Sequence, residues 1–213
     1  MEVKHYDVII ATPGSMLCCN YVQSLAETLS ALTGRGLTYK YVNCQGSPVN
    51  VARERVIAEV MKYSYNKVIW IDSDIGFTPE DIFKLYDSDK DIITGTYLLA
   101  DGNITTIGPL PQDRKPGQGE FKKQEVLKLN KVMKVHSAGF GFIAMTSKVF
   151  PRIPKPYFQL LNNVIKNGSG KDIYISLGED ISWCLKAQDV GFDIWFDPTI
   201  LVNHMKTNTV GWK

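Results

Sequence analysis

Two aspartates at the end of an apolar run are the residues that first suggest chemistry. The stretch 69–74 reads Ile-Trp-Ile-Asp-Ser-Asp, so a buried strand is expected to end at Asp72 and Asp74. Because side chains alternate along a strand, these carboxylates project to the same side and can converge on one point. Close carboxylates need a cation beside them, and Mn²⁺ or Mg²⁺ suits such oxygen ligands. The alternative is that both aspartates only solubilise a turn and cap the following helix.

Two further groups downstream strengthen the prediction of a metal site. Glu179 and Asp180 open an amphipathic helix, a position that the helix dipole favours for acids whatever their function. His204 follows the apolar run 199–202 and offers a nitrogen ligand to the same cation, in a combination with carboxylates that suits Mn²⁺. A single histidine is more often structural, so His204 is significant only together with the aspartates at 72–74 and the acids at 179–180.

These residues need a framework that brings them to one edge, and the apolar pattern predicts strands that alternate with helices. Strands are expected over 6–11, 37–42, 67–71, 91–97, 140–145 and 192–196, and helices over 20–32, 50–63 and 179–190, with one more opening at 78–79. Asn50 and Thr78 are the expected caps of two of these helices. The alternation predicts an α/β fold with a mostly parallel central sheet and helices on both faces. In such a sheet ligands bind beyond the carboxyl ends of the strands, where Thr-Pro-Gly-Ser at 12–15 also falls.

The C-terminal half is less regular. Residues 100–119 are rich in Gly, Pro and polar side chains, and a long loop of this kind is usually functional or disordered. The strand-like runs 126–129 and 132–135, together with 140–145, predict antiparallel additions to the sheet.

Composition excludes several classes of protein. The chain has 213 residues, so one domain is expected. Its formal charge of +2 gives no electrostatic field that favours binding to nucleic acid. The four cysteines lack zinc-site spacing, and the N-terminus lacks an apolar signal region, so we expect reduced thiols in a cytoplasmic protein without membrane insertion. The last residues, 210–213, carry no mark of a natural end, which is compatible with a domain excised from a longer protein.

The order of the motifs resembles that of the GT-A glycosyltransferases. Asp-x-Asp on a strand is followed by a Gly-rich strand entry at 136–141, by acids that open a helix, and by an aromatic strand and a histidine. The sequence looks most similar to the small glycosyltransferase domains encoded by large algal viruses (chloroviruses). This resemblance implies a single Rossmann-like GT-A domain over 1–213, with a nucleotide-binding half at about 1–98 and an acceptor and metal half at about 99–213.

The resemblance also implies roles for individual residues. The nucleotide and donor sugar would be bound by Thr12, Pro13, Ser15, Arg53, Asp72, Ser73, Ala138, Gly139 and Lys206. Asp72 would lie beside the ribose, and Asp74 and His204 would hold the metal. Asp72 is also expected as the third metal ligand. Asp180, with Glu179 beside it, would act on the acceptor hydroxyl.

The implied activity is transfer of a hexosyl or deoxyhexosyl group from a UDP-sugar to a hydroxyl of a glycan or glycoprotein, with Mn²⁺ or Mg²⁺. UDP-glucose is the default donor and UDP-rhamnose the alternative, while the stereochemical course and the oligomeric state stay open. A sugar nucleotidyltransferase is a rival, although its first loop is richer in Gly and Arg than 12–15. A non-catalytic sugar-binding domain is a second rival, and a dehydrogenase is the weakest because the first turn lacks three-glycine spacing.

Overall fold

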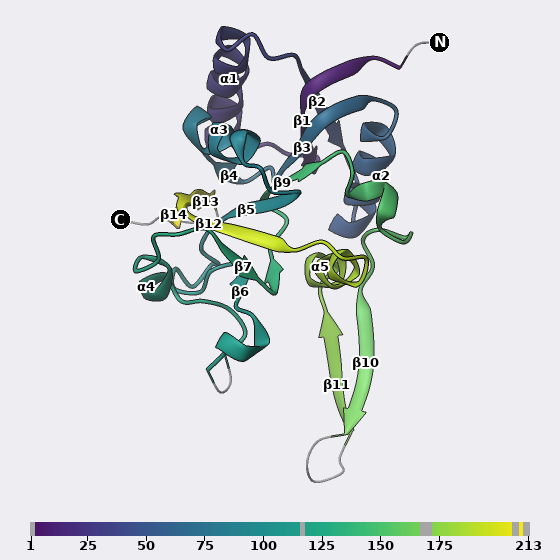
Figure 1. Cartoon of the computed structure of the whole chain (residues 1–213), viewed down its shortest axis with the longest axis vertical. Coiled ribbons are helices and arrows are strands. Elements are labelled where there is room, and N and C mark those ends of the chain that lie inside the picture. Colours follow the sequence, from purple (N-terminus) through teal and green to yellow (C-terminus); the bar gives the residue numbers. More distant parts are fainter. Residues whose placement is uncertain (1–2, 116–117, 167–171, 206–208, 211–213) are drawn as a thin grey trace.

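A seven-stranded sheet forms the centre of the computed structural model, which describes residues 3–115, 118–166, 172–205 and 209–210 (Figure 1). The strand order in this sheet is β2-β1-β3-β9-β5-β12-β7. The elements of the first half are β1 (His5–Pro13), α1 (Cys19–Gly34), β2 (Tyr39–Cys44), α2 (Val49–Val60), β3 (Ser64–Ile71), β4 (Ile75–Gly76), α3 (Pro79–Asp87) and β5 (Ile92–Thr96).

The second half contributes shorter elements and the last strands of the sheet. They are β6 (Ile107–Gly108), the 3₁₀ helix η1 (Pro111–Asp113), α4 (Lys123–Val126), β7 (Met133–Val135), β8 (Ser137–Ala138), β9 (Phe142–Thr146), the 3₁₀ helix η2 (Phe150–Arg152), β10 (Leu161–Lys166), β11 (Asp172–Leu177), α5 (Glu179–Asp189), β12 (Ile194–Leu201), β13 (Asn203–Met205) and β14 (Thr209–Val210).

Most strands of the central sheet run in one direction. β2 and β3 flank β1 in parallel, and β12 pairs in parallel with β5. β9 lies antiparallel between β3 and β5, and β7 is antiparallel to β12 at the edge. The antiparallel strands both come from the C-terminal half, so the predicted α/β fold with a mostly parallel sheet and antiparallel additions is confirmed.

Helices cover both faces of the sheet, because its strands are apolar on both sides. In β1, Val8 and Ile10 face a core shared with α1 and α3, whereas Ile9 and Ala11 face a core shared with α2 and α5. All four side chains are fully buried. A strand that is apolar at every position is typical of a sheet with both faces covered.

Several local predictions can be compared with the structure. Thr78 caps α3 as predicted, through reciprocal hydrogen bonds with Asp81. The prediction that Asn50 caps α2 is wrong, since Pro48 holds that position. The strand predicted over 126–129 is also wrong: its first residue ends the short helix α4. Val126 and Leu129, three residues apart, both pack on the core while Leu127 is 47% exposed, so the apolar positions follow helical rather than strand spacing.

A hairpin that the sequence did not predict projects from the body of the molecule (Figure 1). Its strands, β10 and β11, pair antiparallel from Leu161 opposite Leu177 to Lys166 opposite Asp172. Among the described residues these strands pair only with each other. The hairpin connects the sheet to α5 and leads directly to Glu179.

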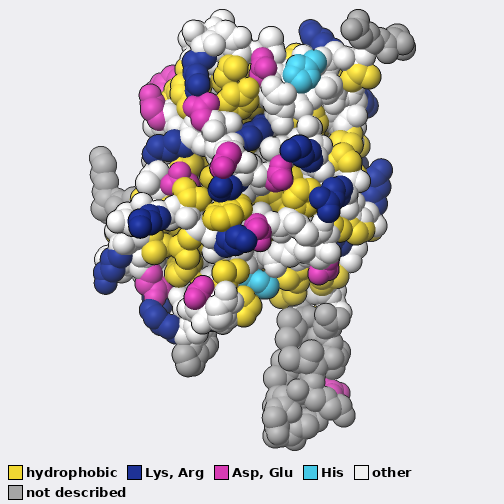
Figure 2. Space-filling model, in the orientation of Figure 1, with side chains coloured by type: hydrophobic (Ala, Val, Ile, Leu, Met, Phe, Trp, Pro, Cys, Tyr) yellow, Lys and Arg dark blue, Asp and Glu magenta, His cyan; other side chains and the backbone are white. Residues whose placement is uncertain are grey.

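The surface carries charges of both signs. Figure 2 shows Lys and Arg side chains interspersed with Asp and Glu on the visible face, as the small net charge predicts. In the part of the chain that the structure describes, no helix is both long enough and apolar enough to cross a bilayer.

Candidate functional site

The carboxyl ends of β1 and β3 border a pocket of about 260 Å³. These strands are neighbours in the sheet, so the turns that follow them lie side by side. We call this cavity the β1–β3 pocket; its lining residues are Pro13, Gly14, Ser15, Gly46, Val49, Ala52, Asp72, Ser73 and Asp74. The structure thus brings the predicted residues of the first and third strand exits to one cavity.

The loop after β1 is fixed by close contacts. Gly14 has a φ of +127°, and a Cβ at this position would lie 3.0 Å from Ser73 Oγ. Asn43 Nδ2 donates hydrogen bonds to the carbonyls of Thr12 at 2.9 Å and Gly14 at 3.0 Å. The Thr12 side chain is fully buried and bonds to the hydroxyl of Tyr21. Thr12, expected to bind the nucleotide, is therefore not among the residues that line the pocket.

Asp74 and His204 meet beside this pocket although 130 positions separate them in the sequence. Asp74 Oδ2 lies 3.3 Å from His204 Nε2, and the histidine side chain is 8% exposed. Strand pairing produces the contact, because His204 lies opposite Ile75 and the Met205 amide donates to the Asp74 carbonyl at 2.7 Å. The other ring nitrogen, Nδ1, lies 2.9 Å from the Leu98 carbonyl. A carbonyl only accepts, so Nδ1 carries a proton and Nε2 faces the carboxylate.

This arrangement fits a cation. In the neutral imidazole, Nε2 is an acceptor, and so is the Asp74 carboxylate, so the contact is favourable only with a proton or a metal ion between them. One nitrogen and one carboxylate oxygen are ligands that Mn²⁺ accepts. Among the described residues, however, no group of three or more His, Cys, Asp and Glu side chains is placed to hold a metal ion. Two members of the expected metal set, Asp74 and His204, are brought together.

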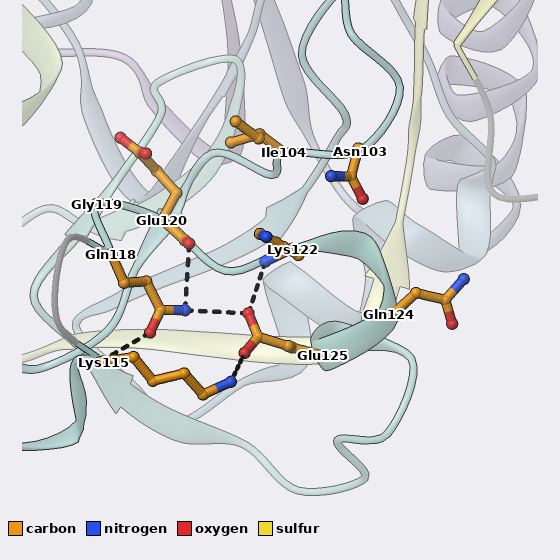
Figure 3. Close-up of a pocket in the computed structure, with 9 residues that line it drawn as sticks. All are labelled: Asn103, Ile104, Lys115, Gln118, Gly119, Glu120, Lys122, Gln124 and Glu125. Carbon is orange, nitrogen blue, oxygen red and sulfur yellow. Dashed lines mark hydrogen bonds and ion pairs between the residues drawn. The ribbon is translucent and has the colours of Figure 1, made fainter.

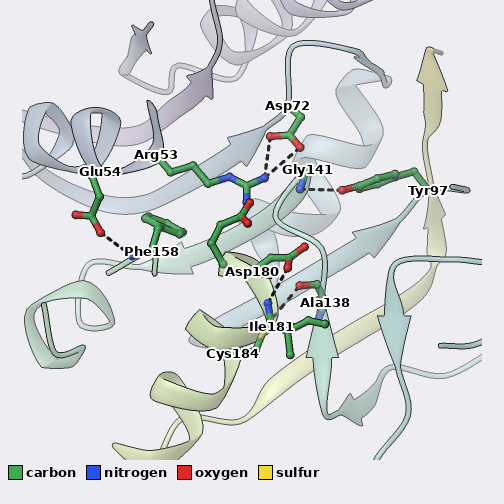
Figure 4. Close-up of polar contacts among 11 residues, drawn as sticks. Arg53, Glu54, Asp72, Tyr97, Ala138, Gly141, Phe158, Asp180, Ile181 and Cys184 are labelled. Carbon is green, nitrogen blue, oxygen red and sulfur yellow. Dashed lines mark hydrogen bonds and ion pairs between the residues drawn. The ribbon is translucent and has the colours of Figure 1, made fainter. Parts of the chain in front are cut away.

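Asp72, the third member, is held by Arg53 instead (Figure 4). Arg53 Nη2 lies 3.3 Å from both Asp72 carboxylate oxygens, and Nη1 lies 2.6 Å from Glu179 Oε1. The Arg53 side chain is only 5% exposed and its guanidinium lies 5.3 Å from the Phe140 ring centroid. Arg53, expected to bind the nucleotide, thus joins the end of β3 to the start of α5 and is absent from the lining of the β1–β3 pocket.

A second pocket, of about 100 Å³, opens beside Asp180. We call it the Asp180 pocket; it is lined by Leu99, Thr105, Thr106, Glu120, Ser137, Ala138, Gly139, Asp180 and Ile181. Asp180 Oδ1 accepts a hydrogen bond from the Ile181 amide at 2.8 Å. Burial raises the pKa of Asp180 above its ordinary value, and the charge of Arg53 and the Ile181 amide offset this only in part. A carboxylate with a raised pKa is a better proton acceptor near neutral pH.

The segment Ala138–Gly139 is held against α5 by Cys184. The buried thiol lies 3.5 Å from the Ala138 amide nitrogen and 3.6 Å from its carbonyl oxygen (Figure 4). Burial raises the pKa of Cys184 to about 12, so this thiol is unreactive and its contribution is packing. The contact fixes Ala138 and Gly139, which line the Asp180 pocket, relative to α5, the helix that carries Asp180.

Tyr97 connects the two regions, although it was not among the residues predicted for the site. Its ring packs edge-on against His204 with centroids 4.9 Å apart, and its hydroxyl accepts the Gly141 amide at 3.2 Å. A Cβ at Gly139 or Gly141 would lie 2.8 or 2.5 Å from that hydroxyl oxygen, so both positions need glycine. The next residue, Leu98, supplies the carbonyl that orients His204. The Gly-x-Gly pattern was the available signal, but nothing in the sequence indicated its partner.

The predicted site residues fall into three groups. Lining residues of the two pockets are Pro13, Ser15, Asp72, Ser73, Asp74, Ala138, Gly139 and Asp180, with His204 paired to Asp74. Thr12, Arg53 and Glu179 lie behind these walls and hold them in place. Lys206 lies outside the described residues, so its role stays a prediction.

Comparison with known proteins supports the fold. No protein-family model matches the chain, and no curated protein matches it. Among solved structures, A197 from STIV superposes with a TM-score of 0.57 at 13% identity, covering 96% of this chain and 86% of that chain. The chain shares its fold with A197. The expected GT-A-like α/β arrangement is confirmed. Because the sequence identity is low, the similarity to A197 applies to the fold alone.

Two other solved structures are similar over parts of the chain. A glycosyltransferase involved in the glycosylation of the major capsid of PBCV-1 has a TM-score of 0.35 at 13% identity, covering 68% of this chain and 62% of that one. The inositol-1-phosphate CTP transferase from T. maritima has a TM-score of 0.42 at 13% identity, covering 91% and 84%. Both scores are too low to support an argument about this chain.

Replacing Arg53 tests its place between two carboxylates. Arg53→Met leaves Asp72 and Glu179 half-buried without their cation, so the free energy of unfolding should fall by about 3 kcal/mol in urea titrations followed by circular dichroism. Arg35→Met is the matched control, because Arg35 pairs with Asp87 at the surface, with side chains 41% and 52% exposed. This exposed pair should contribute much less. Equal losses in the two variants would contradict a buried bridge at Arg53.

Proposed function

We propose that this chain is a metal-dependent glycosyltransferase that moves a hexosyl or deoxyhexosyl group from a UDP-sugar to a hydroxyl of a glycan or glycoprotein. The observation that carries the proposal is the Asp74–His204 contact of 3.3 Å at the edge of the β1–β3 pocket. An oriented imidazole and a carboxylate beside a pocket at the carboxyl ends of parallel strands are suited to hold the metal of a nucleotide diphosphate. The motif order that resembles the GT-A glycosyltransferases supports the same assignment.

Asp74 and His204 would hold the divalent cation, Mn²⁺ or Mg²⁺. When bound, such an ion stabilises the negative charge that develops on the diphosphate as the glycosyl–phosphate bond breaks. Because the protein offers a pair of ligands, phosphate oxygens and water can occupy the remaining positions. Asp72 is paired with Arg53, which suits a place beside the uncharged ribose rather than the metal.

The β1–β3 pocket would receive the nucleoside. Pro13, Val49 and Ala52 supply apolar surface for a base, and Ser15 and Ser73 supply hydroxyl groups. Gly14 has a positive φ and no side chain, and a Cβ here would lie 3.0 Å from Ser73 Oγ, so its backbone can approach a ligand closely. UDP is assigned as the nucleotide because of the resemblance stated above.

Asp180 would accept the proton of the attacking hydroxyl in an inverting transfer. The acceptor oxygen forms a bond to the anomeric carbon while the bond from that carbon to the diphosphate oxygen breaks, UDP leaves, and the hydroxyl proton moves to Asp180. Glu179, held by Arg53 at 2.6 Å, positions the first turn of α5 for this step. The raised pKa of Asp180 favours proton uptake in the transition state.

Calorimetric titration of UDP into the protein tests the proposal. Binding should require Mn²⁺, and Asp74→Ala and His204→Ala should each weaken it about tenfold or more, because each removes a metal ligand. His5→Ala is the matched control, since His5 is exposed at the start of β1 and should bind UDP like the wild type. Absence of UDP binding under every condition would refute the assignment.

The pH dependence of UDP release from UDP-glucose, with water as acceptor, tests the role of Asp180. The groups that act on its charge are Arg53 and Glu179. The rate should fall on acidification as Asp180 becomes protonated, at a pH above the ordinary aspartate pKa of about 3.9. Asp180→Asn should lower the rate about 10³-fold. Asp189→Asn, an exposed change at the other end of α5, is the control, and an unchanged rate in Asp180→Asn would exclude Asp180 as the base.

A further inference from the structure

Glu120 adds a second carboxylate to the Asp180 pocket. Its backbone is fixed, because Gln118 Nε2 donates to the Glu120 carbonyl at 3.3 Å and to Glu125 Oε2 at 3.0 Å. Figure 3 shows the Glu120 carboxylate pointing away from the ion pair between Lys115 and Glu125. Within the described part of the chain no hydrogen bond or ion pair holds this carboxylate, so it is available to a ligand.

No cation in the lining offsets these carboxylates. Apart from Glu120 and Asp180, the described lining of the Asp180 pocket consists of small, hydroxyl-bearing and aliphatic residues. Arg53, whose charge acts on Asp180, is already shared between Asp72 and Glu179. Lys115 and Lys122 line a separate pocket of about 450 Å³ that Glu120 also borders (Figure 3). The Asp180 pocket is therefore an acidic cavity.

The size and walls of this cavity suit part of a sugar ring. Its volume of about 100 Å³ is that of a few water molecules, at about 30 Å³ each. Leu99 and Ile181 offer apolar surface to the C–H face of a ring. Carboxylates accept hydrogen bonds from sugar hydroxyls strongly, since charged acceptors form the stronger bonds.

The cavity lies next to the expected diphosphate position. Tyr97 contacts His204 with its ring, and its hydroxyl lies 2.8 Å from where a Cβ on Gly139 would be. Leu99 of the Asp180 pocket is adjacent in sequence to Leu98, whose carbonyl binds His204. Tyr97 therefore touches both His204 and the segment that lines the Asp180 pocket, which places the two sites on either side of one aromatic side chain.

We infer that Glu120 is a specificity-determining residue that makes the Asp180 pocket accept an uncharged glycosyl group and reject anionic sugars such as uronates. The inference rests on the proposed function, with the nucleotide in the β1–β3 pocket and the transferred sugar in the Asp180 pocket. A uronate would bring a third carboxylate into a partly buried site that already holds two, and like charges at close range repel. Rejection by an unfavourable charge is an efficient source of specificity.

Calorimetry with Mn²⁺, comparing UDP-glucose with UDP-glucuronate, tests this inference. The wild type should bind UDP-glucose at least about tenfold more tightly. Glu120→Gln should reduce this ratio, and Glu120→Lys should reduce it further or reverse it. Glu80→Gln, an exposed change in the first turn of α3, should leave the ratio unchanged. Affinity for UDP itself, which does not reach Glu120, shows that each variant is folded.

Two results would overturn the inference and leave the proposed function intact. The first is equal affinity of the wild type for UDP-glucose and UDP-glucuronate. The second is a ratio in Glu120→Gln and Glu120→Lys that equals the wild-type ratio while UDP binding is retained. Failure of the wild type to bind UDP at all would instead refute the proposed function, and the inference with it.

Discussion

The contact between His204 and Asp74 is the constraint on which the account depends, because two acceptors 3.3 Å apart are stable only with a proton or a cation between them. The fold enforces the contact through the pairing of β13 with β4 and through the Leu98 carbonyl, which fixes the imidazole. Tyr97 packs on the same ring. Since these contacts come from the backbone and a buried aromatic side chain, the pair is preorganised before any ligand binds.

A second constraint is the pairing of Arg53 with two carboxylates, which places the acids of the site in different environments. Arg53 holds Asp72 and Glu179, so neither competes for a cation at Asp74. Asp180 is left in a buried position where its pKa is raised. Neighbouring acids thus differ in their environments rather than in their chemistry, which is how one site can contain both a metal ligand and a proton acceptor. Glu120 adds a further carboxylate to the lining of the Asp180 pocket.

Local sequence patterns predicted much of the fold, whereas most long-range contacts between side chains could not be predicted from them. The continuous apolar run of β1 and the Thr78 cap of α3 gave correct elements, since each signal lies within a few residues. The run 126–129 was misassigned because a short apolar run fits helix and strand spacing alike. Convergence of Asp74 with His204 followed from strand ends and motif order. The engagement of Asp72 by Arg53 and the role of Tyr97 depend on side-chain directions that no local pattern encodes.

Anomalous scattering at the manganese edge, from crystals grown with Mn²⁺ and UDP, would test the metal site most directly. We expect an anomalous peak between the Asp74 carboxylate and His204 Nε2, next to the UDP diphosphate, with Asp72 still bound to Arg53. UDP bound in the β1–β3 pocket with no peak at Asp74 and His204, or with manganese held elsewhere, would contradict it.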